Sequence, residues 1–193
     1  IRALAGNDTI VLSNADWDQY AAGIELDNID GGDGIDTLEY RYKDGDNVSY
    51  VYLEKSIQNI EHFVLSGTGR FNNVTFDADL WRNLDSVSVN GLSNAYINGD
   101  GGAISLSNLN NATNLGIYIN GELSEFSISD YGGSLSDINV GKFGAVKSII
   151  GSVEDDTFSY SWTTIYDDVG NKLDLNLGDG DDTVKLNNFY IYG

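Results

Sequence analysis

Residues 31–39 read Gly-Gly-Asp-Gly-Ile-Asp-Thr-Leu-Glu, which is a complete copy of the nine-residue unit Gly-Gly-x-Gly-x-Asp-x-apolar-x. This unit repeats in parallel β-rolls that bind calcium. Its glycines permit a left-handed turn and let backbone carbonyls approach an ion, Asp36 supplies a carboxylate, and Leu38 begins a strand. The stretch therefore predicts one coil of a β-roll with oxygen ligands for a hard cation.

An ion in such a roll lies between the turns of neighbouring coils, so a single unit requires partners. Three further stretches share the ending Asp-Thr-apolar, but other residues stand at one or more of their glycine positions. They are residues 178–184, with Leu177 at the first glycine position, residues 151–158, with Glu154 at the third, and residues 5–10, preceded by Ala3 and Leu4.

The final aspartates of the four stretches form two similarly spaced pairs, Asp8 with Asp36 at 28 residues and Asp156 with Asp182 at 26. Each pair encloses far more than one unit, so we expect ion sites that cap a solenoid and not a continuous roll. An ordinary Gly/Asp turn is the alternative for each stretch. The predicted calcium ligands are Asn7, Asp8, Gly31, Asp33, Gly34, Asp36, Asp155, Asp156, Asp179, Asp181 and Asp182.

The chain is strongly acidic, because 30 Asp and Glu residues against 10 Lys and Arg give a formal net charge of −20. Phosphate binding needs a positive surface, so this composition argues against nucleic acid as a partner. Bound calcium would offset the self-repulsion and contribute its binding energy to folding. We therefore expect several calcium ions, a fold that loosens without them, and an extracellular location. Solubility alone is the alternative explanation of the charge.

Catalysis has little support in the sequence. The chain has no cysteine, and His62 is its only histidine, for which a structural role is expected. The chain has 30 acidic residues, so many carboxylate pairs occur by chance, and no single pair indicates a glycoside-hydrolysing site. We predict that the chain is not an enzyme.

The chain also lacks the marks of membrane insertion. No apolar run approaches the roughly 20 residues of a spanning helix, and the start has no signal-peptide pattern. Direct membrane insertion is therefore not expected, and a secretion signal is expected elsewhere in a longer precursor.

The length of 193 residues and the lack of a linker-like segment predict one domain, residues 1–193, excised from a larger protein. Calcium-type flanks span about residues 1–39 and 151–193, around a solenoid-like centre at about 57–150. Alternating strands separated by turn residues predict two hairpin insertions. The first joins residues 37–43 to 48–53, and the second joins 158–166 to 172–177.

Apolar residues recur through the centre at roughly 22 to 30 residues, which suits the coils of a solenoid. One short helix is expected at residues 77–84, with Asp77 as its N-cap. The predicted fold class is all-β: a calcium-stabilised, β-solenoid or β-roll-like single domain with hairpin insertions and at most one short helix. The recurring residues are Ile57, Ile60, Phe63 and Leu65, then Leu84, Val87, Val89 and Leu92, then Leu109, Leu115, Ile117 and Ile119.

A four-residue pattern recurs within the centre, since residues 96–99 and 118–121 both read Tyr-Ile-Asn-Gly. In strands, the isoleucines would face one way and the tyrosines and asparagines the other, as an outward ladder. The alternative is that the asparagines satisfy backbone groups at solenoid turns and the tyrosines pack under a hairpin. Residues 98–102 offer a further calcium loop or a simple turn. The candidate ligand-binding residues are Tyr96, Asn98, Asp100, Tyr118 and Asn120.

The Gly/Asp stretches resemble the repeats of the RTX (repeats-in-toxin) superfamily. The resemblance covers about residues 3–12, 31–39, 151–159 and 177–186. It implies export by a type I secretion system and calcium-dependent folding, without defining an activity.

Among RTX proteins, the plan looks most like the peptide-binding domain of giant bacterial adhesins, in which degenerate repeats flank a non-repeating centre. That resemblance implies a monomeric module on the bacterial cell surface that binds the C-terminal end of a peptide or protein on a host or neighbouring cell. Attachment and biofilm formation would follow. A calcium-rigidified spacer, a glycan-binding module and an accessory module of a polysaccharide-acting enzyme are the alternatives.

Overall fold

The computed structural model describes residues 1–13, 24–26, 28–42, 50–53, 56–67, 71–89, 92–99, 101–110, 115–121, 123–129, 135–140, 148–166 and 174–192. The chain divides into two compact units. Unit 1 comprises residues 1–95 with 108–112, and unit 2 comprises residues 96–107 with 113–193. Strand β10 (Leu92–Asn98) crosses the division. The single domain remains a prediction, and each unit is described by itself.

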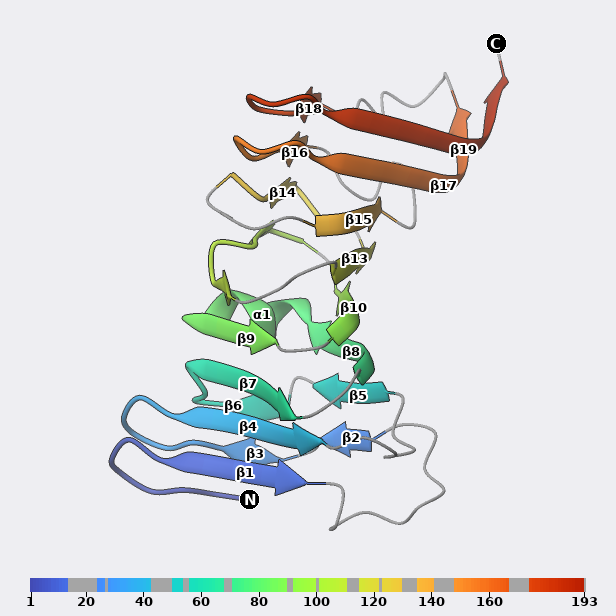
Figure 1. The fold of residues 1–193 in the computed structure, drawn as a ribbon. Helices are drawn as coiled ribbons and strands as arrows, with labels where there is room; N and C mark the ends of the chain where they lie inside the picture. Colours follow the sequence, from blue (N-terminus) through green and yellow to red (C-terminus); the bar gives the residue numbers. More distant parts are fainter. Residues whose placement is uncertain are drawn as a thin grey trace. The chain divides into compact units, whose positions relative to one another are not determined.

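Parallel strands stack coil upon coil in unit 1 (Figure 1). The largest sheet has the order β1-β4-β7-β9-β12, a second contains β2-β5-β8, and β3 pairs with β6. The strands are β1 (Thr9–Ser13), β2 (Ile24–Leu26), β3 (Ile29–Asp30), β4 (Thr37–Tyr42), β5 (Tyr50–Leu53), β6 (Ile57–Gln58), β7 (His62–Gly67), β8 (Phe71–Asp77), β9 (Ser86–Val89) and β12 (Leu109–Asn110).

Unit 2 repeats this architecture with two runs of parallel strands, β11-β14-β16-β18 and β13-β15-β17-β19. All the strand pairs with a described register are parallel, so each strand lies beside the equivalent strand of the next coil and runs in the same direction. The strands are β11 (Ala103–Ser105), β13 (Leu115–Asn120), β14 (Glu125–Ser127), β15 (Leu135–Val140), β16 (Ser148–Ile150), β17 (Thr157–Tyr166), β18 (Asp174–Asn176) and β19 (Thr183–Tyr192).

The registers confirm the predicted solenoid. In unit 1, successive coils take 28, 25 and 24 residues, as the aligned residues Thr9, Thr37, His62 and Ser86 show. Residues two apart on a strand face the same way. Because the parallel register aligns equivalent residues of neighbouring coils, the inward-facing apolar residues form buried columns. Phe63 aligns with Val87 in one such column. Each such side chain contributes about 1.5–3 kcal/mol on burial.

The predicted helix is also confirmed. Helix α1 spans Ala78–Asn83, and the Asp77 carboxylate caps it by accepting a hydrogen bond from the backbone N–H of Asp79 at 2.9 Å. Trp81 is buried and packs edge-to-face on Phe76, with ring centroids 4.9 Å apart. The helix therefore replaces one strand of a coil and still faces the core.

The two predicted hairpins are wrong. Strands β4 and β5 belong to different sheets, and each pairs in parallel with equivalent strands of neighbouring coils. Strands β17 and β18 likewise belong to different sheets, and each pairs in parallel with strands of neighbouring coils. Stacking one coil on the next satisfies the backbone hydrogen bonds that a hairpin would have made, so the strand alternation was compatible with both arrangements. The predicted turns, at 44–47 and 167–171, lie outside the described residues.

Among the described residues, no helix has both the length and the apolar character needed to cross a membrane.

Candidate functional site

The motif turns of unit 1 are tied together by the Asp36 carboxylate. Its Oδ1 accepts a hydrogen bond from the backbone N–H of Asp8 at 2.8 Å. The Asp8 carbonyl in turn accepts from the N–H of Thr37 at 2.9 Å. One residue earlier, the side-chain oxygen of Asn7 accepts from the N–H of Ile35 at 3.1 Å. The spacing of 28 residues therefore places two predicted ligands in facing turns, as expected.

Unit 2 repeats this hydrogen-bond pattern. The N–H of Asp156 donates to Oδ1 of Asp182 at 3.0 Å, and the N–H of Thr183 donates to the Asp156 carbonyl at 2.8 Å. The Asp155 carboxylate accepts from the N–H of Asp181 at 2.8 Å. The two motif pairs are thus structural equivalents within their own units.

Glycines are required where neighbouring turns touch. A Cβ at Gly31 would lie 1.8 Å from the Asn59 carbonyl oxygen and 2.7 Å from Oδ2 of Asp36. A Cβ at Gly34, whose φ is +145°, would lie 2.1 Å from the Gly6 carbonyl oxygen. These motif glycines therefore let carbonyl and carboxylate oxygens of adjacent coils converge.

The second oxygen of Asp36 has no hydrogen-bond partner among the described residues. The Asp36 side chain is 0% exposed, and its Oδ2 is buried. An unpaired buried polar atom costs about 1–3 kcal/mol, and a charged one costs more. A bound cation would remove this cost.

The donor chemistry around Asp36 fits calcium, although side chains alone do not complete a site. Within the described residues, no group of three or more His, Cys, Asp or Glu side chains is arranged to hold a metal ion. Calcium commonly takes backbone carbonyls and water among its six to eight oxygen ligands. The Asp36 Oδ2 and the Asn59 carbonyl oxygen both lie close against Gly31, since a Cβ there would be 2.7 Å from the first and 1.8 Å from the second.

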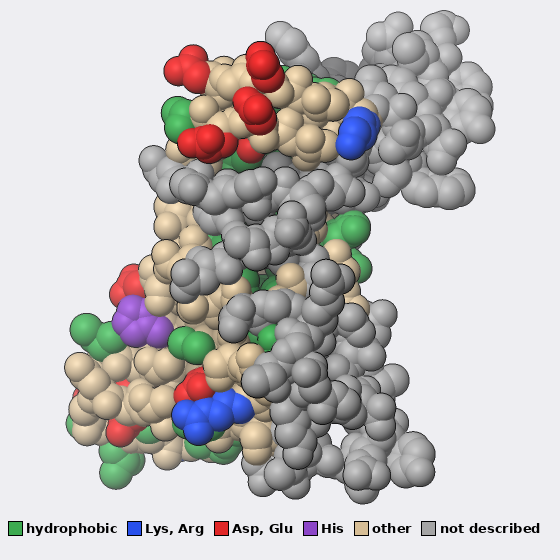
Figure 2. Space-filling model, viewed as in Figure 1, with side chains coloured by type: hydrophobic (Ala, Val, Ile, Leu, Met, Phe, Trp, Pro, Cys, Tyr) green, Lys and Arg blue, Asp and Glu red, His purple; other side chains and the backbone are tan. Residues whose placement is uncertain are grey.

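The turns of unit 2 differ at this point. Oδ2 of Asp156 accepts hydrogen bonds from both the N–H and the hydroxyl of Ser152, at 2.9 and 3.0 Å. Ser152 stands where the complete motif has a glycine, so the buried carboxylate is satisfied by the protein itself. The side chains of Asp155, Asp179 and Asp181 are exposed, and Figure 2 shows acidic side chains gathered over the β16–β18 end of unit 2.

Sequence reasoning missed two residues at the Asp36 turn. Oε2 of Glu61 accepts a hydrogen bond from the N–H of Asp36 at 2.7 Å. Asn59 has a positive φ of 52° and donates from its side-chain nitrogen to Asp30 at 2.7 Å. Both lie in a coil without the glycine motif, so only the strand register could have found them. Because His62 aligns with Thr37, Glu61 occupies the coil position of Asp36.

The predicted ladder in unit 2 is present at its tyrosines. The rings of Tyr96 and Tyr118 are stacked, with centroids 4.7 Å apart and planes 19° apart. Ile97 and Ile119 are buried, so the tyrosines face outward as expected. Asn98 is exposed, whereas Asp100 and the side chain of Asn120 lie outside the described residues. A ligand-binding role for these residues stays a prediction.

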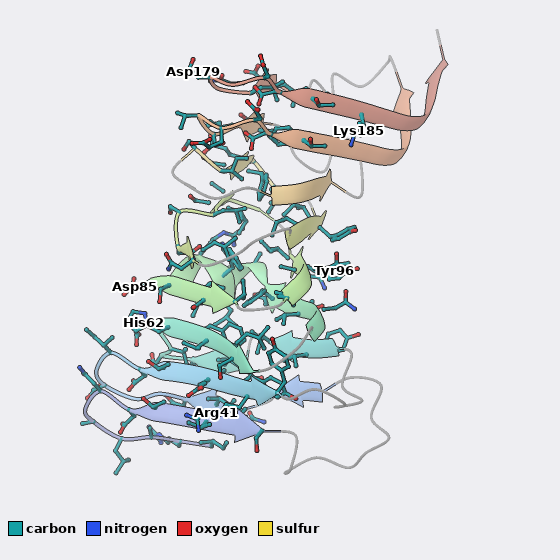
Figure 3. All side chains as sticks on the ribbon, in the orientation of Figure 1. Arg41, His62, Asp85, Tyr96, Asp179 and Lys185 are labelled. Carbon is teal, nitrogen blue, oxygen red and sulfur yellow. The ribbon has the colours of Figure 1, made fainter. Side chains whose placement is uncertain are left out.

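His62 is half-buried, with Nδ1 2.8 Å from the hydroxyl oxygen of Ser86 in the next coil (Figure 3). A cavity of about 370 Å³ lies beside α1 in unit 1. Buried Ile57, Ile60 and Leu80 line it, together with exposed polar side chains. None of the predicted site residues borders this cavity.

Comparisons of the chain with protein-family models, with curated proteins and with solved structures find no match. The fold and the turns therefore define the class of this protein as a parallel β-solenoid with carboxylate-linked coils.

Proposed function

We propose that the chain is a calcium-dependent ligand-binding module of a secreted bacterial RTX adhesin, and that it binds the C-terminal end of a peptide or protein on a host or neighbouring cell. Attachment and biofilm formation would be the biological outcome. The resemblance of the Gly/Asp stretches to RTX repeats supports the family, the export route and the extracellular location. The parallel β-solenoid supports the same proposal.

One observation carries the calcium part of the proposal: the buried Oδ2 of Asp36, which has no partner among the described residues. The sequence motif independently predicts a cation at this residue. Asp36 and the Asn59 carbonyl would contribute to holding the ion, with Glu61 supporting the Asp36 backbone. The net charge of −20 gives the fold a second reason to need cations.

The Tyr96–Tyr118 pair supports the binding part of the proposal. Two half-exposed aromatic side chains stacked on a rigid sheet offer contact area at little cost in conformational entropy. A spacer would need neither of them on its outer surface.

The proposal is tested by thermal unfolding and by capture on an array of peptides and glycans, each with calcium and with excess chelator. We expect calcium to raise the melting temperature and to permit capture of peptides with a free carboxyl terminus. Tyr118→Ser should weaken capture without lowering the melting temperature much, whereas Tyr118→Phe retains the stacked ring. An unchanged melting temperature in chelator would remove calcium from the proposal.

A calcium-rigidified spacer is the second candidate, because the carboxylate links between coils serve rigidity as well as they serve ligand binding. It predicts calcium-dependent stability with no capture of any peptide or glycan. Capture of glycans alone would favour a glycan-binding module, and turnover of a bound polysaccharide would favour the enzymatic alternative.

A further inference from the structure

The stacked tyrosines belong to a longer column of aligned strand positions in unit 2. The strand registers align Tyr118 on β13 with Asn139 on β15, Ser159 on β17 and Lys185 on β19. Tyr96 of β10 extends the column by stacking on Tyr118. We call Tyr96, Tyr118 and Lys185, with the two aligned backbone positions between them, the outward column.

Burial of the adjacent column establishes which way Tyr118 and Lys185 face. Ile117 aligns with Ile138 and then with Phe158, and both Ile117 and Phe158 are fully buried. Successive residues of a strand point to opposite faces. The Tyr118 and Lys185 side chains therefore lie on the outer face, where Tyr118 is half-exposed and Lys185 is exposed.

Lys185 carries a positive charge that has no ion-pair partner among the residues the structure describes. Of the Lys and Arg residues that the structure describes, the other three each pair with a carboxylate: Arg2 with Asp30, Arg41 with Glu39 and Arg82 with Asp79. Lys185 alone among them forms no such pair. On a chain with a net charge of −20, an available ammonium group is complementary to a ligand carboxylate.

The dimensions of the outward column suit a short extended peptide. Neighbouring strands lie about 4.8 Å apart, so Lys185 is about 14 Å from Tyr118 and about 19 Å from Tyr96. An extended chain advances about 3.3 Å per residue, so about six residues span the column. Stacking also covers one face of each tyrosine ring, which leaves less flat aromatic surface for a sugar.

We propose that the outward column binds the last six or so residues of an extended peptide. The terminal carboxylate pairs with the Lys185 ammonium group, and apolar side chains about five residues upstream contact Tyr96 and Tyr118. This inference rests on the proposed function and gives its ligand a direction and an anchor.

The charge of the acidic turn before β19 affects how strongly Lys185 attracts a ligand carboxylate. Asp182 lies three residues before Lys185, or about 10 Å along the strand, which is close to the Debye length at 0.1 M salt. Figure 3 shows Asp179 at that turn and Lys185 farther along β19. Carboxylates of the turn that hold no cation repel a ligand carboxylate at this distance. Binding through Lys185 should therefore strengthen when cations neutralise the turn.

The test uses a fluorescein-labelled peptide about six residues long, with two aromatic residues at its amino end and either a free or an amidated carboxyl end. Fluorescence anisotropy in calcium compares the unmodified chain with Lys185→Gln, Lys185→Arg and the charge-matched control Arg82→Gln. Lys185→Gln should weaken binding of the free-acid peptide by roughly two- to fivefold, as an exposed ion pair does. Lys185→Arg and Arg82→Gln should bind as the unmodified chain does.

The decisive readout is whether the effects of peptide amidation and of Lys185→Gln on binding depend on each other. If Lys185 holds the carboxylate, amidation and Lys185→Gln each remove the same contact, and their combined effect equals that of either alone. Additive effects, or equal losses in Lys185→Gln and Arg82→Gln, overturn the anchor while the proposed function stands. Failure of every peptide to bind in calcium overturns the proposed function itself. Lys185-dependent binding of an oligouronate without any peptide binding overturns the peptide assignment.

Discussion

The backbone N–H of Asp8 donates to Oδ1 of Asp36 at 2.8 Å, across 28 residues of sequence. Asp156 and Asp182 repeat this bond at 3.0 Å, across 26 residues. In each case a motif aspartate links its own coil to the preceding one. The carboxylates therefore have a role in the fold that does not depend on a bound cation, and Oδ2 of Asp36, which has no partner among the described residues, is available to an ion.

Asp36→Asn separates these two roles. The amide oxygen can still accept from Asp8, but the change removes the charge of the unpaired Oδ2. In chelator we expect the variant to be as stable as the unmodified chain, or more stable, because a buried unpaired charge is gone. In calcium, it should lose most of the stabilisation that the ion provides.

Melting temperatures with and without calcium check this prediction, with Asp79→Asn as the control for loss of an exposed carboxylate in the same unit. A calcium-dependent shift that survives in Asp36→Asn would place the ion elsewhere.

Gly34→Ala should destabilise unit 1 more than Gly6→Ala. Both glycines have positive φ angles, +145° and +126°, so both variants carry backbone strain. A Cβ at Gly34 also lies 2.1 Å from the Gly6 carbonyl oxygen, whereas nothing lies within 4 Å of one at Gly6. We expect an additional loss of about 1–3 kcal/mol in the free energy of unfolding for Gly34→Ala. Denaturant unfolding measures the difference, and equal losses would mean that the turns are not in contact.

Asn108→Ala should destabilise the end of helix α1. The side-chain nitrogen of Asn108 donates to the Leu84 carbonyl at 2.9 Å and to the Trp81 carbonyl at 3.3 Å. Loss of these part-buried bonds should cost about 1–2 kcal/mol of unfolding free energy. Asn110→Ala is the matched control, because that amide makes one exposed bond at 3.2 Å. Similar values for the two variants would contradict the capping role.

Glu39 should contribute to the acid sensitivity of unit 1. Its pKa is lowered from 4.5, mainly by the hydrogen bond from Arg41 and further by one from Ser66, with burial opposing. A lowered folded-state pKa gives stability that is present above 4.5 and is lost as the pH falls through the folded value. Glu39→Gln should reduce this pH dependence and lower the melting temperature at neutral pH by roughly 1–3 °C. An unchanged slope in melting curves recorded between pH 5 and pH 3 would contradict this role.

Much of the architecture was predictable because it rests on local patterns. The apolar recurrence at Phe63, Leu65, Val87 and Val89 predicted buried columns, and all four are buried. Asp77 followed by an apolar helical face predicted the cap and the helix. The prediction of a hairpin at residues 37–53 was wrong. Alternation of apolar and polar residues along a strand shows which residues face inward, but it does not select the strand with which that strand pairs.

The candidate site was predictable only in part. The spacing of the Gly/Asp stretches correctly paired Asp8 with Asp36, and the repeated Tyr-Ile-Asn-Gly correctly paired Tyr96 with Tyr118. Glu61 was missed because its coil carries no glycine motif.

The sequence by itself determined the coil length, the inward residues and the turns that need glycine, because these follow from backbone conformation and from the two-residue period of a strand. Only the tertiary structure decided which strands pair with one another, which oxygen of Asp36 lacks a partner among the described residues, and that Lys185 lies in line with the tyrosines. Those features depend on the register between strands more than twenty residues apart, and hydrogen bonding and packing select that register only when the whole solenoid forms.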